Sequence, residues 1–390
     1  MSLALGVFVT SFLVTLYIFA GYPALLYVTS RVRPRPVRRA GGSPPVTLVI
    51  PVHNEEAIID AKVQNALALT YPEDRLEILI VSDGSTDRTE AIVERYTTSG
   101  RVRLLRLPRQ GKAYALNAAV SAARHDLVVF SDANSMLRPE SLQALVENFA
   151  DPEVGGVCGN KTLRRPGAAD TTERGEGLYW RYDKWQKRLE SEIGSIFAAD
   201  GTLHAVRKAL YVPMTDPCQA DDIAISTRVV LQGSRLVYEP RAVAVEDAPS
   251  EGREEFRRKV RVTNHSVRAL LNLRGALWSS GFYTVELVSH KLLRHYSPYF
   301  LLALFVSNLA LAGRGQALRL VFVGQVAFYT LAAAGFLLRA TRVGRLQPFA
   351  VPYYFCLVNL AALLGTWSVA RGVRLQAWTP RGGLRSKESR

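Results

Sequence analysis

Acidic side chains occur at two places in the chain where they could bind a metal cation and take a proton from a hydroxyl group. Asp132 and Asn134 lie two residues apart, directly after an apolar run that ends at Phe130. Carboxylate and amide oxygens are hard ligands that suit Mg²⁺ or Mn²⁺. Further along, Asp221 and Asp222 are adjacent, and we expect neighbouring carboxylates to raise each other's pKa towards that of a general base at neutral pH. The sequence has no cluster of His or Cys residues that could perform this chemistry instead.

Each of these residues also has a purely structural interpretation. Asn134 could cap a helix. Asp221 and Asp222 could form an ordinary acidic helix start, which the helix dipole favours. The choice depends on the elements that position them.

The apolar segments around these residues predict a sheet of mostly parallel strands. Residues 46–50 form a continuous apolar run, which is typical of a strand covered on both faces, and Pro51 ends it. Residues 78–81 form a second such run. From about residue 45 to residue 275, short β-branched runs alternate with helical patterns, which indicates βαβ units and an α/β domain.

Polar residues follow both of these predicted strands, at the edge where open α/β sheets bind ligands. Asn54 and Glu55 follow the first strand, and Asp83 follows the second. Asp83 could accept a hydrogen bond from a nucleobase N–H or a ribose hydroxyl, but Asn54 could also cap a helix and Asp83 could form a turn. No GxGxxG is present, and Gly111-Lys112 lacks the remaining residues of a P-loop, which argues against both of those nucleotide folds.

Apolar segments predict that the chain is attached to a membrane at both ends. Residues 3–30 contain no charged side chain and exceed the roughly 20 residues that cross a bilayer as a helix. A cleaved signal peptide would need a basic n-region, which is absent. Three further apolar segments, 298–312, 317–338 and 349–370, close the chain.

The basic residues give the expected orientation but leave one conflict open. The arginines that follow the first apolar segment place that flank in the cytoplasm by the positive-inside rule, and they are Arg31, Arg33, Arg35, Arg38 and Arg39. Three later crossings would then place the equally basic tail, 371–390, on the opposite side. The segment 298–312 is the shortest of the three, and an amphipathic helix at the membrane surface is an alternative for this region.

The charge and the cysteines argue against a nucleic-acid partner, a disulfide framework and a zinc site. The net charge of +15 could suggest nucleic acid, but the basic residues lie beside apolar segments, so anionic lipid headgroups are the simpler partner. Cys158, Cys218 and Cys356 form no CxxC pair. The sequence therefore predicts no nucleic-acid partner, no disulfide framework and no zinc site.

Six motifs in this order resemble the membrane-bound branch of family 2 glycosyltransferases, which includes the cellulose, chitin and hyaluronan synthases. They occur across roughly residues 46 to 245 and are PVHNEE, VSDGSTD, GKAYALN, FSDAN, ADGTLHAVRK and QADDIAISTRVVLQGSRLVYEP. The resemblance implies a GT-A fold, a nucleotide-diphospho-sugar transferase domain with a mostly parallel sheet, flanked by transmembrane helices. It also implies an inverting transfer of a sugar from a nucleotide-sugar donor, expected to be a UDP-sugar.

The same resemblance implies roles for individual residues. Asp132 and Asn134 occupy the place of the DxD motif that holds Mg²⁺ or Mn²⁺ against the diphosphate, and the Asn removes one negative charge. Asp222 corresponds to the residue that deprotonates the acceptor hydroxyl, with Asp221 as the second catalytic residue. The implied donor-binding residues are Pro51, Asn54, Glu55, Asp83, Lys112, Asp132, Arg258 and Arg261. The implied acceptor-binding residues are Asp200, Gly201 and Thr202.

The chain departs from the family pattern at positions that bear on the product. Ala220 replaces a Thr, and the Gln-x-x-Arg-Trp motif of processive synthases is represented by Arg258, Arg261 and Val262, so its Gln and Trp are absent. These losses favour a single transfer to a lipid-linked or saccharide acceptor over a processive polysaccharide synthase coupled to export. A catalytically inactive, membrane-anchored sugar-nucleotide-binding protein is a third alternative, and this basic cluster could also rest on anionic lipid.

We expect an integral protein of a bacterial inner or plasma membrane that takes part in polysaccharide or cell-envelope biosynthesis, with its catalytic domain in the cytoplasm. The oligomeric state stays open. The expected domains are a transmembrane helix (1–30), a basic linker (31–44), a GT-A catalytic domain (45–250), basic interfacial helices (251–296), transmembrane segments (297–370) and a basic tail (371–390).

Overall fold

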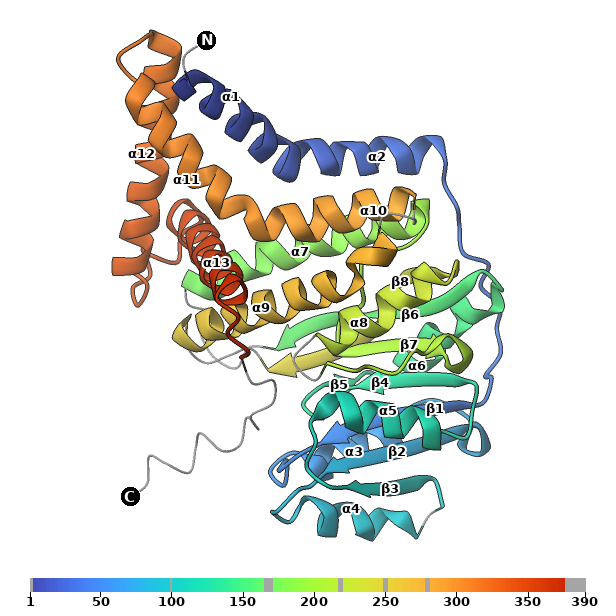
Figure 1. Cartoon of the computed structure of the whole chain (residues 1–390). Helices are drawn as coiled ribbons and strands as arrows, with labels where there is room; N and C mark the ends of the chain where they lie inside the picture. The colour runs from blue at the N-terminus through green and yellow to red at the C-terminus, as the bar shows by residue number, and fades with distance from the viewer. Residues whose placement is uncertain are drawn as a thin grey trace, which may run out of the picture.

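The computed structural model describes residues 3–98, 100–164, 171–216, 220–247, 252–277 and 281–375 (Figure 1). Cys218 and most of the basic tail lie outside these ranges. The soluble part contains one eight-stranded sheet with the strand order β3-β2-β1-β4-β7-β6-β8-β5. The strands are β1 Val46–Val52, β2 Leu76–Asp83, β3 Val102–Leu107, β4 Leu127–Ser131, β5 Met136–Leu137, β6 Val154–Arg164, β7 Leu203–Arg207 and β8 Arg235–Asp247.

The sheet is mixed but mostly parallel, which confirms the predicted fold class. Strand β1 pairs in parallel with β2 and β4, and β2 pairs in parallel with β3. Strand β7 is antiparallel to β4 and β6, whereas β6 and β8 are parallel. Every residue of β1 and β2 is buried, as their continuous apolar sequences predict. Since β1, β2 and β4 run in the same direction, their carboxyl ends open at the same edge of the sheet.

Helices cover both faces of this sheet and form two apolar cores. On one face, α3 (Ile59–Leu67), α4 (Thr89–Thr97) and α6 (Ser141–Val146) contribute buried side chains to a core with β1 and β2. On the other face, α5 (Lys112–Ala122) and α8 (Asp221–Leu231) form a second core. Both α5 and α8 begin at the carboxyl edge of the sheet, so their first residues lie beside the loops that follow β2 and β4.

A second group of helices joins the sheet domain to the apolar segments. Helices α2, α7 and α10 lie beside one another above the sheet, while α1, α11 and α12 extend away from it (Figure 1). These helices are α1 Leu3–Leu16, α2 Tyr22–Val32, α7 Thr171–Ile193, α9 Gly252–Leu277, α10 Phe282–Glu286, α11 Leu293–Leu311, α12 Gln316–Leu337 and α13 Gln347–Ala370. Helix α13 packs so closely on α9 that a Cβ at Gly365 would lie only 2.6 Å from Cβ of Thr263.

Among the described residues, three helical segments are long and apolar enough to cross a membrane: Leu3–Val32, Gln316–Leu337 and Gln347–Ala370. The remaining apolar segment of the sequence, 298–312, falls mostly in α11 and is not one of these three. The stretch before it carries Arg294 and His295, which shorten the uncharged part of the helix. The sequence left the number of spans open, and three helices of the described residues are candidates by length and composition.

The first spanning segment bends, and its second half lies against the soluble domain. A π-helical turn at Tyr17–Gly21 separates α1 from α2, and the change of direction is visible in Figure 1. Tyr22 and Leu26 of α2 are fully buried and pack on Leu189 of α7. The Tyr22 hydroxyl donates a hydrogen bond to Glu190 over 2.6 Å. The opposite face of α2 exposes apolar side chains, which suits the interfacial region of a bilayer.

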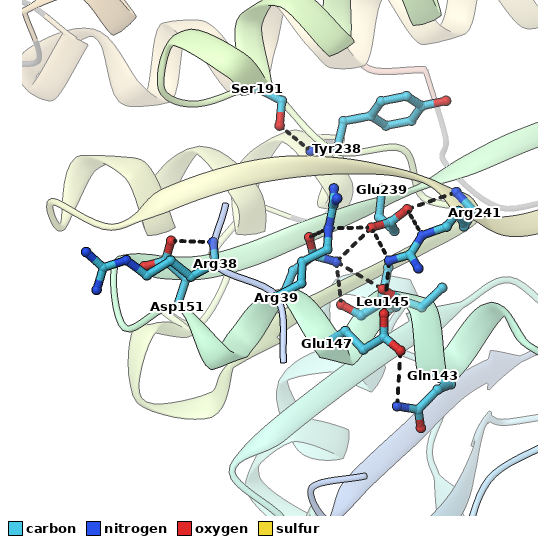
Figure 2. A network of polar contacts seen from close by, with 12 residues as sticks. Arg38, Arg39, Gln143, Leu145, Glu147, Asp151, Ser191, Tyr238, Glu239 and Arg241 are labelled. Atoms are coloured by element: carbon cyan, nitrogen blue, oxygen red, sulfur yellow. Dashed lines mark hydrogen bonds and ion pairs between the residues drawn. The ribbon is translucent and has the colours of Figure 1, made fainter. Parts of the chain in front are cut away.

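The basic linker after α2 contacts carboxylates of the soluble domain. The guanidinium of Arg39 lies 3.1 Å from Glu239, which also accepts a hydrogen bond from Arg241 over 2.9 Å (Figure 2). The backbone N–H of Arg38 donates to Asp151, and Arg35 pairs with Glu153 of the segment before β6 over 2.9 Å. The side chains of Arg35 and Arg39 and the backbone of Arg38 thus fix the linker to the domain.

Candidate active site

The loops after β1 and β2 are tied together at the carboxyl edge of the sheet. Asn54 adopts a left-handed backbone conformation with φ of 53°. Its side-chain oxygen accepts a hydrogen bond from the backbone N–H of Thr86 over 2.7 Å, and its own N–H donates to Ser85. Asn54 does not cap α3, because that helix begins at Ile59. Pro51 and Glu55 flank this turn, and the Glu55 N–H donates over 2.8 Å to the hydroxyl of Thr89, the first residue of α4.

Asp83, at the end of β2, is fully buried and shapes the loop that leads to Lys112. Its carboxylate accepts hydrogen bonds from the Arg109 guanidinium over 2.6 Å and from the backbone N–H groups of Gln110 and Gly111 over 2.8 and 2.9 Å. The neighbouring turn requires glycine. Gly84 has φ of +63°, and a Cβ there would lie 2.7 Å from the Arg109 nitrogen.

The loop that carries Asp132 and Asn134 is supported from beneath by Lys62 of α3. The buried Lys62 ammonium donates to the Ser131 hydroxyl over 2.8 Å and to the carbonyl oxygen of Ser135, so it contacts both ends of the loop. Burial lowers its pKa to about 7, although Asp132 and Glu246 oppose that shift. Asn134 does not cap α6, which begins at Ser141.

Lys112, the first residue of α5, bridges two of the candidate carboxylates. Its ammonium lies 2.7 Å from Oδ1 of Asp132 and 2.9 Å from Oδ2 of Asp221. Burial disfavours its charge, but the two carboxylates outweigh burial and raise the pKa of Lys112. Lys112 is therefore charged at neutral pH and joins the loop after β4 to the start of α8.

The two adjacent aspartates of α8 differ in their electrostatic surroundings. Burial, followed by the charges of Asp221 and Asp200, raises the pKa of Asp222 to about 6. For Asp221, burial acts in the same direction, but the charge and hydrogen bond of Lys112 prevail and lower its pKa. The expectation that both values rise is therefore wrong for Asp221, because Lys112 faces that residue.

Gly201 lies between Asp132 and Asp222 and brings the predicted acceptor loop into the site. Its backbone N–H donates to Oδ2 of Asp222 over 3.1 Å. A Cβ placed on Gly201 would lie 3.6 Å from Oδ2 of Asp132 and 3.8 Å from Oδ2 of Asp222. The two carboxylates thus face the same small space. The loop is held on both sides, since Asp200 pairs with Lys187 over 2.7 Å and the Thr202 carbonyl accepts a hydrogen bond from Ser131.

The two arginines that the family resemblance implies as donor ligands both lie on α9. Arg258 donates to Glu255 of its own helix over 2.6 and 2.8 Å, and Arg261 lies about one turn further along, partly buried. The residue of α9 that lies nearer the start of α8 is His265, whose carbonyl accepts a hydrogen bond from the Ala220 N–H over 3.4 Å. Its ring contacts the Leu375 carbonyl oxygen at 3.0 Å.

Sequence reasoning did not identify Lys62, Lys187 or His265. None of them falls in a recognisable motif. A lysine within an amphipathic helix is ordinarily expected on the solvent side, so no local signal marks Lys62 or Lys187 as buried.

The oxygen donors at this edge fit a hard divalent cation. Asp132 and Asn134 are partly exposed, and Oδ2 of Asp132 faces the space beside Gly201. No group of three or more His, Cys, Asp or Glu residues in the described part of the chain is placed to hold a metal ion. Mg²⁺ and Mn²⁺ can complete their coordination with water and phosphate oxygens, so two oxygen ligands from the protein suit them.

Comparisons with known proteins agree with the motifs and the fold. Residues 47–211 match the family model described as Glycosyl transferase family 2, a range that includes Asp83, Lys112 and Asp132 and ends before Asp222. The poly-beta-1,6-N-acetyl-D-glucosamine synthase of Staphylococcus aureus is 30% identical over 208 residues, which cover 51% of this chain and 48% of that protein. The Staphylococcus epidermidis synthase is 28% identical over the same share of each. The chain therefore spans about half the length of these relatives.

A solved structure extends the similarity of the fold to nearly the whole chain. The mannosyltransferase PcManGT from Pyrobaculum calidifontis, determined in complex with GDP-Man and Mn²⁺, superposes with a TM-score of 0.65 and 23% sequence identity. The match covers 92% of this chain and 99% of that one. The expected GT-A fold is thus confirmed, and the match to family 2 glycosyltransferases covers residues 47–211 of the chain.

Proposed function

We propose that the chain is an inverting glycosyltransferase that moves a sugar from a nucleotide-sugar donor, expected to be a UDP-sugar, to a lipid-linked or saccharide acceptor at the membrane surface. The observation that carries this proposal is the convergence of Asp132, Lys112 and Asp222 around Gly201 at one sheet edge. These groups come from separate parts of the chain and supply the cation ligand, the phosphate-binding charge and the base that such a reaction needs.

Asp222 is the proposed general base. Its pKa of about 6 leaves it ionised at neutral pH and still basic enough to accept the proton of an acceptor hydroxyl. The Gly201 N–H orients its carboxylate, and the missing side chain of Gly201 leaves space for that hydroxyl beside it. The acceptor oxygen attacks the anomeric carbon as the nucleoside diphosphate departs from the opposite face, so one displacement inverts the configuration.

The leaving group is handled by the residues on the other side of Gly201. Asp132 and Asn134 would hold Mg²⁺ or Mn²⁺, which neutralises charge that develops on the departing diphosphate. Lys112 is charged and within reach of the same position, and its ammonium can exchange a carboxylate partner for a diphosphate oxygen. Pro51, Asn54, Glu55 and Asp83 are proposed to surround the nucleoside. Arg258, which pairs with Glu255, and Arg261 are the further candidates of α9 for the diphosphate, as the family resemblance implies.

Two products are compatible with this mechanism. The absence of the Gln and Trp of the processive motif at the α9 positions supports a single transfer. The similarity to poly-beta-1,6-N-acetyl-D-glucosamine synthases over about half of their length supports chain elongation as the second candidate. The length of the product separates the two, because elongation yields a ladder of oligosaccharides whereas single transfer yields one species.

We also propose that the catalytic domain and the basic tail face the cytoplasm. If the arginine flank after the first span is cytoplasmic, the two remaining spans lead out of the cytoplasm and back into it. The segment after Ala370 then lies on the same side as that flank. Three crossings therefore remove the conflict that four apolar segments created.

The proposal is tested by nucleotide release from the full chain in lipid, with UDP- and GDP-sugars and Mg²⁺ or Mn²⁺. We expect Asp222→Asn to lower kcat by about 10²- to 10⁴-fold while it retains donor binding, and Asp132→Ala to lose the dependence on the divalent cation. Asp74→Asn is a matched control, because that carboxylate is exposed and remote from the site. Normal turnover by Asp222→Asn would refute the base assignment. Donor binding without turnover by the wild-type chain would indicate an inactive binding protein.

A further inference from the structure

A cavity of about 660 Å³ opens where the first membrane segment meets the soluble domain. Its walls come from the end of α2, the end of α7, the turn before β8 and the start of α10. It lies at the edge of the sheet where β6 and β8 begin, which is opposite the edge that carries the candidate active site. The comparisons and the proposed mechanism assign it no role.

The charge of this cavity favours an anion. Three arginines line it, Arg33, Arg35 and Arg235, together with the carboxyl groups of Glu153 and Glu286. Glu153 is engaged by Arg35 over 2.9 Å. Arg235 is buried, lies 3.9 Å from Asp151 and 4.0 Å from Glu153, and donates hydrogen bonds to three backbone carbonyl oxygens. For Arg33, the structure records no ion pair with any described residue. The lining therefore carries a net positive charge, part of it uncompensated by the protein.

The other acidic residue of the lining, Glu286, is a candidate hydrogen-bond donor. It is 2% exposed, and its Oε1 has no hydrogen-bond partner within the described part of the chain. Burial, assisted by the charge of Glu190, raises the pKa of Glu286 well above its usual range. A protonated carboxyl group does not repel an anion, and it can donate a hydrogen bond to a phosphate oxygen, which only accepts.

Apolar side chains continue from the mouth of the cavity onto the surface. Phe282 lines the cavity and remains partly exposed, and Val32, next to Arg33, is exposed. Leu25 and Val28 extend this apolar surface along the outer face of α2. A ligand that matches the whole feature has an anionic head and a hydrocarbon body, and a free phosphate would match only the head.

We propose that this cavity binds the phosphate headgroup of an anionic phospholipid, with Arg33 at the phosphate and the acyl chains along α2 and Phe282. The bound lipid would fix the height and tilt of the soluble domain on the bilayer. The cavity also contacts the segment that leads to the acceptor loop at Asp200. Ser195 of this segment lines the cavity, and the Tyr283 hydroxyl donates to the Phe197 carbonyl over 2.7 Å. Any effect on turnover rests on the proposed function, whereas binding does not.

Binding is measured by native mass spectrometry of the full chain in detergent, titrated with phosphatidylglycerol or with phosphatidylcholine, whose choline offsets the phosphate charge. We expect the wild-type chain to retain one phosphatidylglycerol in preference to phosphatidylcholine, and Arg33→Gln to weaken that binding about tenfold, as the loss of one contact to a charged group predicts. Arg31→Gln is the matched control, since Arg31 lies two residues earlier, stacks on Tyr27 and does not line the cavity. It should change the affinity less than about twofold.

Three results would overturn the proposal. Equal losses in Arg33→Gln and Arg31→Gln would indicate attraction to the general surface charge and no defined site. Equal retention of the two lipids would remove the preference for an anion. Displacement of the lipid by millimolar inorganic phosphate or glycerol phosphate would show that the site takes a soluble phosphate. Glu286→Gln, which keeps a donor at that position, should bind like wild type, and a loss there would contradict the role assigned to the protonated carboxyl.

Discussion

The raised pKa of Asp222 makes a quantitative prediction for the pH dependence of turnover. The base must be ionised to accept a proton, so kcat/KM should fall as the pH drops through the pKa of Asp222, which is about 6. From this value, the ionised fraction falls from roughly 0.9 at pH 7 to roughly 0.1 at pH 5. We therefore expect kcat/KM to decrease about tenfold over this range.

Replacement of the neighbouring carboxylate tests the cause of the shift. Asp221 is a negative charge beside Asp222, and its charge raises the pKa of Asp222. Asp221→Asn removes that charge, so the pKa of Asp222 should fall and the acidic limb should move to lower pH, by about one unit. The absolute rate of this variant also falls, because Lys112 loses one of its two partners. The informative quantity is the rate at pH 5 relative to the rate of the same variant at pH 7.

The assay is the initial rate of nucleotide release at subsaturating donor between pH 4.5 and pH 8, in one lipid composition and at fixed ionic strength. Burial lowers the pKa of His204 to about 4, so this histidine does not titrate between pH 5 and 7. Burial also lowers the pKa of His265 from its usual value. Recovery of the rate when the sample returns to pH 7 excludes unfolding as the cause. A flat wild-type profile between pH 5 and 7, or an acidic limb that moves upward in Asp221→Asn, would refute the reasoning.

Two further substitutions test the geometry of the site. Gly201→Ala adds a Cβ at ordinary contact distance from Asp132 and Asp222, so we expect an unchanged melting temperature but at least about a tenfold loss of nucleotide release, as the methyl group fills the space for the acceptor hydroxyl; wild-type turnover would contradict that placement. Lys62→Met leaves the Ser131 hydroxyl and the Ser135 carbonyl without their buried donor, so the free energy of unfolding should fall by about 2–5 kcal/mol. Arg88→Met, at an exposed position, should change it by less than about 0.5 kcal/mol. Equal stability of the two variants in a denaturant titration would show that Lys62 does not support the loop.

The sheet and its binding edge could be predicted from sequence because their signals are local. Continuous apolar runs mark β1 and β2 as strands buried on both faces, and alternation with helical patterns makes them parallel. Once the strands are parallel, the residues that follow them must lie at one edge. This is why Asp83 and Asp132, 49 positions apart, could be placed near each other without coordinates.

The buried lysines could not be predicted, because their burial depends on residues far away in the chain. Lys62 stands between Ala61 and Val63 in a short helix that also carries Asp60, Gln64 and Asn65, and a charged side chain in such a helix is ordinarily solvated. It is buried because the loop between Ser131 and Ser135 passes over it and supplies two oxygen acceptors. Lys187 is buried for the same kind of reason, since Asp183 and Asp200 lie on either side of its ammonium.

The flank of arginines shows the limit of a rule based on sequence position. The positive-inside rule describes where such residues end up relative to a membrane, but it does not say what each side chain contacts. Arg39 pairs with Glu239, two hundred positions away, and that carboxylate is fully buried. An unpaired buried carboxylate costs more free energy than an unpaired lipid headgroup, which water solvates. The buried carboxylate of Glu239 therefore determines the contact of Arg39, whereas Arg33 lines the cavity.

The tandem aspartates of α8 show why the roles of neighbouring residues required the structure. Asp221 and Asp222 have the same chemistry and the same place in the first turn of a helix, so any rule based on sequence must treat them alike. Consecutive helical side chains diverge by about 100° around the helix axis, which directs one towards Lys112 and the other towards Gly201. A cation faces Asp221, whereas Asp222 accepts hydrogen bonds from the backbone N–H groups of Gly201 and Ile223. The cation lowers one pKa, while burial and the remaining negative charges raise the other. The separation between a charge-pairing carboxylate and a base thus arises from helix geometry and from the position of Lys112, 109 residues earlier in the chain.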